Sequence, residues 1–350
     1  MTDPDLRIAA IGCGGRLESH AAAIAAVDGV RLVAGFDVDP GRTQAAAEAY
    51  GVVPHTALDE MLADEAPDAV TIVTPPWVRR EVVADSVQAG VKALLIEKPI
   101  ALSPSEAAEL VALCEGRLAA VNTQYQWMPH WRALWPRIAD GALGEVHTIR
   151  CSTWLNVIEQ GPHTIDLATT IARHAGLPPA GSVRAWGQGV DRYVRGERVP
   201  SSLEATFTLG GARMTCVHGD TGLLVPGETD PCLPIHVEAI GSAGRLWVSL
   251  TQGWWLQTRE GWEHGPTDWI ADDLAAQTAV IAELRDHVTA AANGTFPTSI
   301  ERAVANQDML FGAIVACLTR EEIDLGAPID EAVLDDEALW AALGPEREAE

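Results

Sequence analysis

The chain has 350 residues, and because globular domains usually run to roughly 100 to 200 residues, we expect two domains. A formal net charge of −25 argues against nucleic acid or an anionic membrane surface as a partner, because both are bound through clusters of Lys and Arg. The start, Met1–Arg7, lacks the apolar stretch of a secretory signal, and the apolar run Ala69–Val73 is too short to span a bilayer, so we expect a cytoplasmic protein.

Over residues 1–122, short apolar runs alternate with helical segments, which predicts an α/β domain with a parallel, doubly wound Rossmann sheet. The expected strands are Leu6–Ile11, Val30–Phe36, Ala69–Val73, Ala93–Ile96 and Ala119–Val121. The expected helices are Ala21–Val27, Thr43–Tyr50, Val82–Gln88 and Ser105–Cys114. Ligands of such sheets bind beyond the carboxyl ends of the strands, so functional residues are expected directly after each strand.

Residues 123–350 predict a second, α+β domain. A helix over His130–Asp140 leads into a strand-like run, Val146–Trp154. Segments with two-residue alternation follow, which is typical of an open, mostly antiparallel sheet; they are Ser202–Leu209, Arg213–His218, His236–Ile240 and Arg245–Thr251. Helices over Ile281–Ala292 and Ile300–Cys317 end the domain, and their packing back on the first domain stays open. An open sheet would expose one apolar face, which predicts a homodimer or homotetramer.

The first strand runs directly into the sequence Gly12-Cys13-Gly14-Gly15-Arg16-Leu17, and a helix follows. Gly12 permits a tight turn, and Gly14 lets the backbone approach a pyrophosphate at the helix N-terminus. Asp37 ends the second strand, where an acid accepts hydrogen bonds from the adenosine ribose. Together these features predict a dinucleotide site, and the alternative is a tight turn without a ligand.

The carboxylate of Asp37 favours NAD over NADP, because it would repel a 2′-phosphate, while Arg42 keeps NADP as the alternative. Further cofactor contacts are expected after two later strands, at Thr74-Pro75-Pro76-Trp77 and at Glu97-Lys98-Pro99. The predicted cofactor-binding residues are Gly12, Gly14, Gly15, Arg16, Asp37, Thr74, Pro75, Trp77, Glu97 and Lys98.

Lys98 stands out on composition, because Lys92 and Lys98 are the only lysines in the chain. An ammonium is a compact donor for a reacting oxygen, and its pKa moves readily on burial, whereas a guanidinium stays charged and splayed. A functional lysine is one interpretation, and a surface ion pair at a strand end is the other.

The chain resembles the family of glucose–fructose oxidoreductase and inositol 2-dehydrogenase, the Gfo/Idh/MocA family. The resemblance covers nearly the whole length and is carried by several short motifs in their expected order. These are Gly12-x-Gly14-Gly15 with His20, Asp37, Thr74-Pro75, Glu97-Lys98-Pro99, Tyr125-Gln126-Trp127-Met128-Pro129 and Glu159-Gln160-Gly161-Pro162-His163-Thr164-Ile165-Asp166.

This resemblance implies bound NAD or NADP and hydride transfer at a secondary alcohol or ketone of a sugar, inositol or glycoside. It also implies Lys98, His163 and Glu159 as the catalytic residues. A second hypothesis is a glycoside hydrolase or lyase that oxidises its substrate transiently, with no net redox change. A third is a cofactor-binding protein without turnover, against which Lys98 together with His163 argues.

Four residues depart from the family pattern and affect the substrate assignment most. Leu17 stands where the family has a small residue, and Arg79 stands where it often has a histidine. Gln126 stands where an arginine is common, and Glu159 stands where an aspartate is more usual.

Gly161-Pro162 predicts the start of a helix, since proline fits the first turn. The helix N-terminus then keeps His163 neutral and able to accept a proton, while Glu159 precedes the helix and orients the imidazole or binds a hydroxyl. Asp166 is expected to stabilise the first helical turn rather than act on substrate. The predicted substrate-binding residues are Lys98, Gln126, Trp127, Trp154, Glu159 and His163; for the tryptophans, packing is the alternative.

No Cys/His spacing suits a metal, so we expect reduced cysteines and no metal site. The cysteines are Cys13, Cys114, Cys151, Cys216, Cys232 and Cys317.

Overall fold

The computed structural model describes residues 5–193, 197–225, 228, 234–289 and 295–344. The chain divides into two compact units. Unit 1 comprises Met1–Trp127 and Asp273–Val304, and unit 2 comprises Met128–Asp272 and Ala305–Glu350. Each unit is described by itself. None of the described helices is both long and apolar enough to cross a bilayer.

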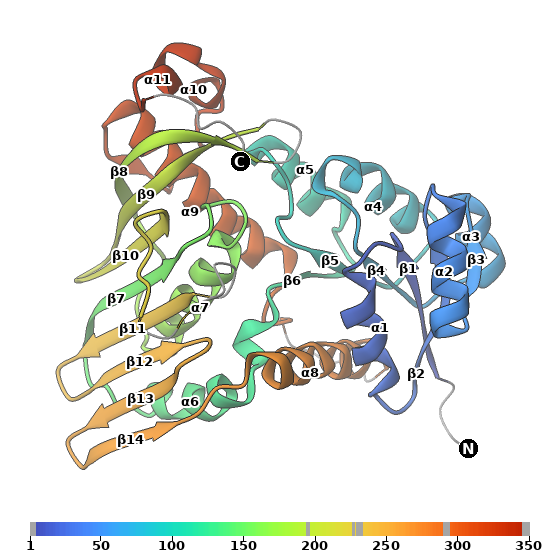
Figure 1. The fold of residues 1–350 in the computed structure, drawn as a ribbon, viewed down its shortest axis with the longest axis horizontal. Helices are drawn as coiled ribbons and strands as arrows, with labels where there is room; N and C mark the ends of the chain where they lie inside the picture. The colour runs from blue at the N-terminus through green and yellow to red at the C-terminus, as the bar shows by residue number, and fades with distance from the viewer. Residues whose placement is uncertain (1–4, 194–196, 226–227, 229–233, 290–294, 345–350) are drawn as a thin grey trace. The chain divides into compact units, whose positions relative to one another are not determined.

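Unit 1 is built on a six-stranded, wholly parallel sheet in the order β3-β2-β1-β4-β5-β6 (Figure 1). The strands are β1 (Leu6–Ile11), β2 (Val30–Phe36), β3 (Val53–His55), β4 (Ala69–Ile72), β5 (Ala93–Glu97) and β6 (Leu118–Asn122). The order reverses between β1 and β4, and such a switch point is where doubly wound sheets bind dinucleotides. The predicted Rossmann sheet is confirmed.

Helices cover both faces of this sheet. They are α1 (Leu17–Ala25), α2 (Pro40–Tyr50), α3 (Leu58–Glu65), α4 (Arg79–Gln88) and α5 (Pro104–Leu113), with short 3-10 turns η1 (Pro76–Val78) and η2 (Gln124–Trp127). Alternate residues of β1 point to opposite faces: Ile11 packs in a core with α3, α4 and α5, whereas Ala10 packs with Leu17 of α1 and Ala46 of α2. Burial on both faces explains the continuous apolar runs in the sequence.

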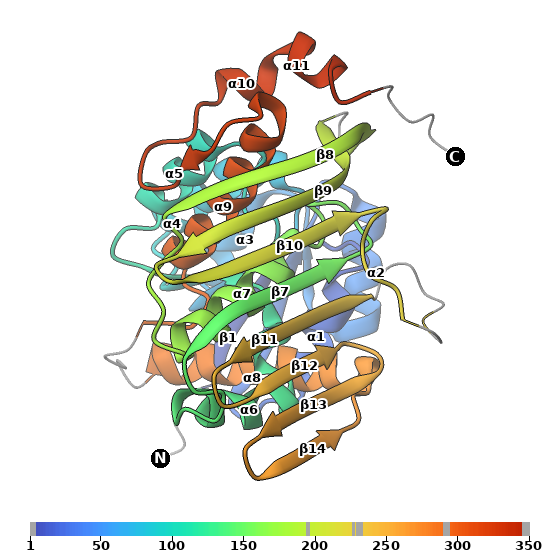
Figure 2. The same ribbon diagram turned by 90° about the vertical axis from the view of Figure 1, so that its left-hand side faces the viewer.

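Unit 2 contains a nine-stranded sheet in the order β14-β13-β12-β11-β7-β10-β9-β8-β15, in which only the described β7–β10 pair is parallel (Figure 2). The strands are β7 (Val146–Thr153), β8 (Ser182–Arg192), β9 (Arg198–Leu209), β10 (Ala212–Gly219), β11 (Ile235–Gly241), β12 (Arg245–Ser249), β13 (Gly253–Thr258), β14 (Gly261–Gly265) and β15 (Ile323–Asp324). This confirms the predicted mostly antiparallel sheet.

The remaining helices are α6 (Pro129–Ala139), α7 (Gly161–His174), α8 (Trp269–Thr289), α9 (Ile300–Thr319), α10 (Ala332–Asp335) and α11 (Glu337–Ala341). Helix α7 packs against β7, β10 and β11 on one face of the nine-stranded sheet. Helix α8 begins at Trp269, three residues before Asp272, from which we expect the chain to return to helix, and from Asp273 onward it belongs to unit 1. The end of the predicted helical stretch Ile281–Ala292, residues 290–292, lies outside the described residues.

The two faces of the nine-stranded sheet differ in chemistry. One face is covered by α7, and we call it the covered face. A row of residues across six paired strands on this face is buried and apolar: Ala185, Ala205, Cys216, Cys151, Val237 and Val248. The adjacent row points to the opposite face, which no helix of unit 2 covers in Figure 2: Arg184, Thr206, Thr215, Arg150, Glu238 and Trp247. We expected this face to be apolar, but it is mainly polar, because ion pairs of Glu238 with Arg150 and Arg245 occupy its centre.

Candidate active site

The turn that contains Gly12, Gly14 and Gly15, which we call the glycine turn, follows β1 in unit 1 and leads into α1. Gly12 has φ +101°, and a Cβ there would lie 3.0 Å from the backbone of Val73, so only glycine fits. At Gly14 and Gly15, by contrast, a Cβ would meet no described atom within 4 Å. The backbone at these two positions is therefore open to a close-lying ligand, as a pyrophosphate site requires.

Leu17 departs from the family fingerprint, and its side chain is buried to 1% exposure. It packs with the small side chains of Ala10 and Ala46 and with Val52. The larger residue is accommodated on the core side of the turn, because its neighbours there are small.

Asp37 follows β2 and is 7% exposed. Its Oδ2 accepts a hydrogen bond of 2.9 Å from the backbone N–H of Cys13, and its Oδ1 accepts one of 3.0 Å from Asp39 N–H. The carboxylate is thus fixed beside the glycine turn. Arg42 Nη1 lies 3.8 Å from Asp37 Oδ2. These residues fit the adenosine end of a dinucleotide, because carboxylate oxygens retain lone pairs for ribose hydroxyls.

The Cys13 thiol lies in the same turn and forms no disulfide with another described cysteine. Burial, with the neighbouring Asp37 charge, raises the pKa of Cys13 to about 11. The thiol therefore stays protonated at neutral pH and is a weak nucleophile.

Arg79 connects the segments that follow β4 and β5. Its side chain is 1% exposed, and Nη2 donates a 2.7 Å hydrogen bond to the carbonyl oxygen of Thr74. Nη1 donates to the carbonyl oxygens of Pro99 and, at 3.3 Å, Ile100. The predicted cofactor residues Thr74 and Pro75 are thereby joined to the segment that carries Lys98, while Trp77 lies half-buried in η1. The sequence analysis treated Arg79 only as a departure from the family pattern and did not predict these contacts.

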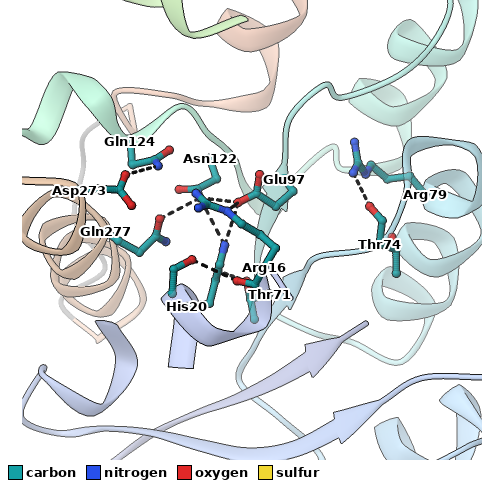
Figure 3. A network of polar contacts seen from close by, with 11 residues as sticks. Arg16, His20, Thr71, Thr74, Arg79, Glu97, Asn122, Gln124, Asp273 and Gln277 are labelled. Atoms are coloured by element: carbon teal, nitrogen blue, oxygen red, sulfur yellow. Dashed lines mark hydrogen bonds and ion pairs between the residues drawn. The ribbon is translucent and has the colours of Figure 1, made fainter. Parts of the chain in front are cut away.

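Glu97, the last residue of β5, is the centre of a buried polar network (Figure 3). Its Oε1 accepts hydrogen bonds from Arg16 Nε at 2.9 Å and from Asn122 Nδ2 at 2.7 Å. His20 Nε2 lies 2.9 Å from the same oxygen and donates to it, since a carboxylate only accepts. Burial opposes ionisation, but the charge of Arg16 and the bonds from His20 and Asn122 hold the pKa of Glu97 well below its usual value.

The network continues to α8, from a much later part of the chain. Gln277 Oε1 accepts a 2.9 Å hydrogen bond from Asn122 Nδ2, and Gln124 Nε2 donates to Asp273 Oδ1 at 2.7 Å. Burial raises the pKa of Asp273. Sequence reasoning missed both α8 residues, because a helical Gln or Asp carries no local signal of such a contact.

The predicted residues that follow β6 are buried. Gln126 is 5% exposed, and Trp127 is 6% exposed, packs on Phe296 and donates from Nε1 to Glu283 Oε2 at 2.6 Å. The environment of Trp127 matches the packing interpretation. Trp154, directly after β7 in unit 2, is 37% exposed.

In unit 2, Glu159 lies in the turn before α7, which begins at Gly161 as predicted. Asn156 shapes this turn: its Oδ1 accepts from Glu159 N–H at 2.9 Å, and its Nδ2 donates to Glu159 Oε2 at 3.3 Å. His163 lies in the first turn of α7 and is 3% exposed. Asp166, also buried, accepts a hydrogen bond from Asn306 Nδ2 at 3.2 Å and so ties α7 to α9.

His218, to which the sequence analysis assigned no role, contacts Thr164 in the first turn of α7. Thr164 Oγ1 donates to the carbonyl oxygen of Gly161 at 3.0 Å, so His218 Nε2 donates to Thr164 Oγ1, also at 3.0 Å. Burial lowers the pKa of His218 to about 4, and the ring is neutral at pH 7. Across the described residues, no group of three or more His, Cys, Asp or Glu side chains is arranged to hold a metal ion.

Residues 6–125 match the model of the GFO/IDH/MocA oxidoreductase family with an NAD-binding Rossmann fold. The chain is 36% identical to D-apiose dehydrogenase of Paraburkholderia graminis over 39% of this chain and 37% of that protein. It is 32% identical to inositol 2-dehydrogenase of Leifsonia xyli subsp. xyli over 43% of this chain and 45% of that protein. These matches therefore span less than half of either relative.

Among solved structures, an oxidoreductase from Agrobacterium radiobacter in complex with NAD+, L-tartaric acid and magnesium is similar over 92% of this chain and 99% of that one. The TM-score is 0.79 and the identity is 20%, so this likeness concerns the fold. The match extends over both units.

Proposed function

We propose, because residues 6–125 match the model of the Gfo/Idh/MocA oxidoreductase family, that the protein transfers a hydride between NAD and a secondary alcohol or ketone of a sugar, inositol or glycoside. One observation carries the proposal. The Glu97 network joins Arg16 of the glycine turn to the strand end that precedes Lys98, so a cofactor turn and a candidate catalytic lysine share one rigid support. We assign NAD binding to residues 1–122, and substrate binding with oligomerisation to residues 123–350, of which Asp273–Val304 belong to unit 1.

The residues around the glycine turn fit a dinucleotide and would hold it. The open backbone at Gly14 and Gly15 suits the pyrophosphate, and Asp37 suits the ribose hydroxyls of NAD. Thr74, Pro75 and Trp77 follow β4 at the neighbouring strand end. When bound, the nicotinamide supplies the acceptor or donor of the hydride.

The chain itself supplies the proton chemistry. We assign to the His163 imidazole the role of base that takes the hydroxyl proton, because a helix N-terminus disfavours its charged form. Lys98 Nζ donates a hydrogen bond to the same oxygen as negative charge develops there. Glu159 orients His163 or binds a second hydroxyl of the substrate, and Gln126 and Trp154 contribute to substrate binding.

The experiment that tests this function is a panel of polyols, sugars and glycosides with NAD and with NADP, followed by absorbance of the reduced nicotinamide. Appearance of NADH with a polyol supports the dehydrogenase. If the protein cleaves an aryl glycoside, requires bound NAD and releases no net NADH, its function is redox-assisted cleavage and not net dehydrogenation. The absence of both reactions and of NADH binding would refute both.

We also propose a homodimer or homotetramer. Trp186 and Trp262 are 54% and 63% exposed on the uncovered face of the nine-stranded sheet, and exposed aromatic side chains are enriched in interfaces. Light scattering at micromolar concentration should give a mass of at least two chains, and Trp186→Glu should lower it. Tyr50→Glu, at an exposed aromatic residue of unit 1, is the control. A monomeric wild type would contradict the assembly.

A further inference from the structure

We propose that Gln277 of α8 is a positioning residue for Lys98 and acts through Asn122 and Glu97. The inference rests on the proposed function, because it concerns the site that Lys98 serves. It adds to that function a residue that lies 179 positions after Lys98 in the sequence.

The contacts form one continuous chain inside unit 1 (Figure 3). Gln277 is 0% exposed, Asn122 1% and Glu97 6%. Asn122 Nδ2 donates one hydrogen to Glu97 Oε1 at 2.7 Å and the other to Gln277 Oε1 at 2.9 Å. Both hydrogens of the amide nitrogen are therefore used, and Glu97 and Gln277 together fix the plane of the Asn122 amide.

The orientation of Asn122 has no acceptable alternative. A flip of its amide would turn Oδ1 toward Glu97 Oε1 and Gln277 Oε1, which are both acceptors. Without the Gln277 acceptor, one amide hydrogen of Asn122 would lose its partner in a buried environment, where such a loss is costly. Asn122 would then turn or shift, and Glu97 would lose a donor that now fixes its carboxylate.

A second observation separates positioning from simple stabilisation. Two amide side chains that only stabilise one another can exchange two hydrogen bonds. Gln277 Nε2 and Asn122 Oδ1, however, have no hydrogen-bond partner among the described residues. The pair makes a single bond instead, and that bond is the one that aligns Asn122 with Glu97.

The effect reaches Lys98 through the main chain. Glu97 closes β5 in register with Asn122 of β6, and the next residue is Lys98. Arg16 and His20 reach Glu97 from the glycine turn and α1, while the support from α8 comes by way of Asn122. We expect a shift of the Glu97 carboxylate to move Lys98, the next residue in the chain, and so to change the reactivity of its amino group.

The test uses the fact that Lys92 and Lys98 are the only lysines. Trace acetylation with acetic anhydride across pH, read by peptide mass spectrometry, gives the reactivity of each lysine in the intact 350-residue chain without NADH. Gln277→Met conserves volume but removes the acceptor. We expect it to change the Lys98-to-Lys92 reactivity ratio about threefold or more, because half a pKa unit changes the deprotonated fraction that much. NADH binding, followed by fluorescence, should weaken about tenfold.

The control is Arg285→Gln on the same helix. Arg285 Nη1 donates to the carbonyl oxygen of Asp28 at 2.9 Å. This variant therefore removes a contact of α8 within unit 1 but keeps the hydrogen bonds that link Gln277 to Glu97. It should keep the wild-type reactivity ratio. Should Gln277→Met fail to fold by circular dichroism, Gln277→Leu removes the same acceptor with a smaller side chain.

An unchanged ratio in the folded Gln277 variant, or an equal change in Arg285→Gln, would overturn the positioning role. Wild-type protein that binds no NADH would instead refute the proposed function. The two failures are distinguishable, because the acetylation experiment needs no cofactor.

Discussion

Arg79 Nη2 donates a 2.7 Å hydrogen bond to the carbonyl oxygen of Thr74 from a side chain that is 1% exposed. The same guanidinium also bonds to the carbonyls of Pro99 and Ile100, so one side chain fixes two strand-end segments of the candidate cofactor site. A guanidinium suits this task because its donors form a rigid planar fork. The departure from the family pattern at this position therefore has a structural function.

Arg79→Leu should destabilise unit 1 by about 3 kcal/mol, because several buried carbonyls lose a charged donor at once. Urea unfolding followed by circular dichroism measures the change. The neighbouring Arg80 is exposed and pairs with Glu109 at 2.5 Å, so Arg80→Leu should cost less than about 1 kcal/mol. Equal losses in the two variants would contradict the linking role of Arg79.

Asp37→Asn should narrow the preference for NAD over NADP by about tenfold, because hydrogen bonds to a charged group are lost and repulsion of a 2′-phosphate ends. Calorimetric titration with NADH and NADPH measures the ratio. Asp39→Asn is the matched control, because Asp39 caps α2 through Gly41 N–H at 2.8 Å. Tighter binding of NADPH than of NADH by the wild type would show that Arg42, and not Asp37, decides the choice of cofactor.

The parallel sheet could be predicted because its strands are buried on both faces and read as continuous apolar runs. Strand β3 was missed for the opposite reason, since it has three residues, includes Pro54 and lies exposed at the sheet edge. The start of α7 was predicted correctly because Gly161-Pro162 marks it locally. The contact of Gln277 with Asn122 joins residues 155 positions apart, and neither residue type gives a local signal of such a contact. It could therefore be found only from the three-dimensional structure.

His218→Gln should reduce the loss of stability in mild acid. The pKa of His218 is about 4 in the folded protein against an ordinary value of 6.5, so below pH 6.5 the unfolded chain binds a proton that the folded one does not. Stability therefore falls as pH decreases from about 6.5 to about 4, by up to about 3 kcal/mol from this group. Urea unfolding at both ends of this window measures the effect.

Some dependence on pH will remain in that variant, because burial also lowers the pKa of His130 and of His236. Glutamine can still donate to Thr164 Oγ1, so stability at pH 7 should change little. His147→Gln, at an exposed histidine, serves as the control and should leave the acid-induced loss unchanged. An identical loss in His218→Gln and wild type would mean that His218 does not stay neutral in the folded protein.

Lys98→Ala and His163→Ala should each lower the catalytic rate by about 100- to 10,000-fold, the usual contribution of a positioned acid–base group. NADH affinity should change less, because the glycine turn and Asp37 carry most of the proposed dinucleotide contacts. Steady-state rates on a substrate that the parent accepts, together with NADH titration, separate the two effects.

Lys92→Ala is the control for Lys98→Ala, because Lys92 is exposed and pairs with Asp68 at 2.7 Å. Its loss should cost at most about 1 kcal/mol of stability and leave the rate unchanged. Glu159→Gln should reduce the rate less than either alanine variant if Glu159 only orients His163, because glutamine can still accept a hydrogen bond. Wild-type turnover by Lys98→Ala would mean that the oxygen of the reacting alcohol is stabilised by another group, since an alkoxide that develops without a nearby donor raises the barrier.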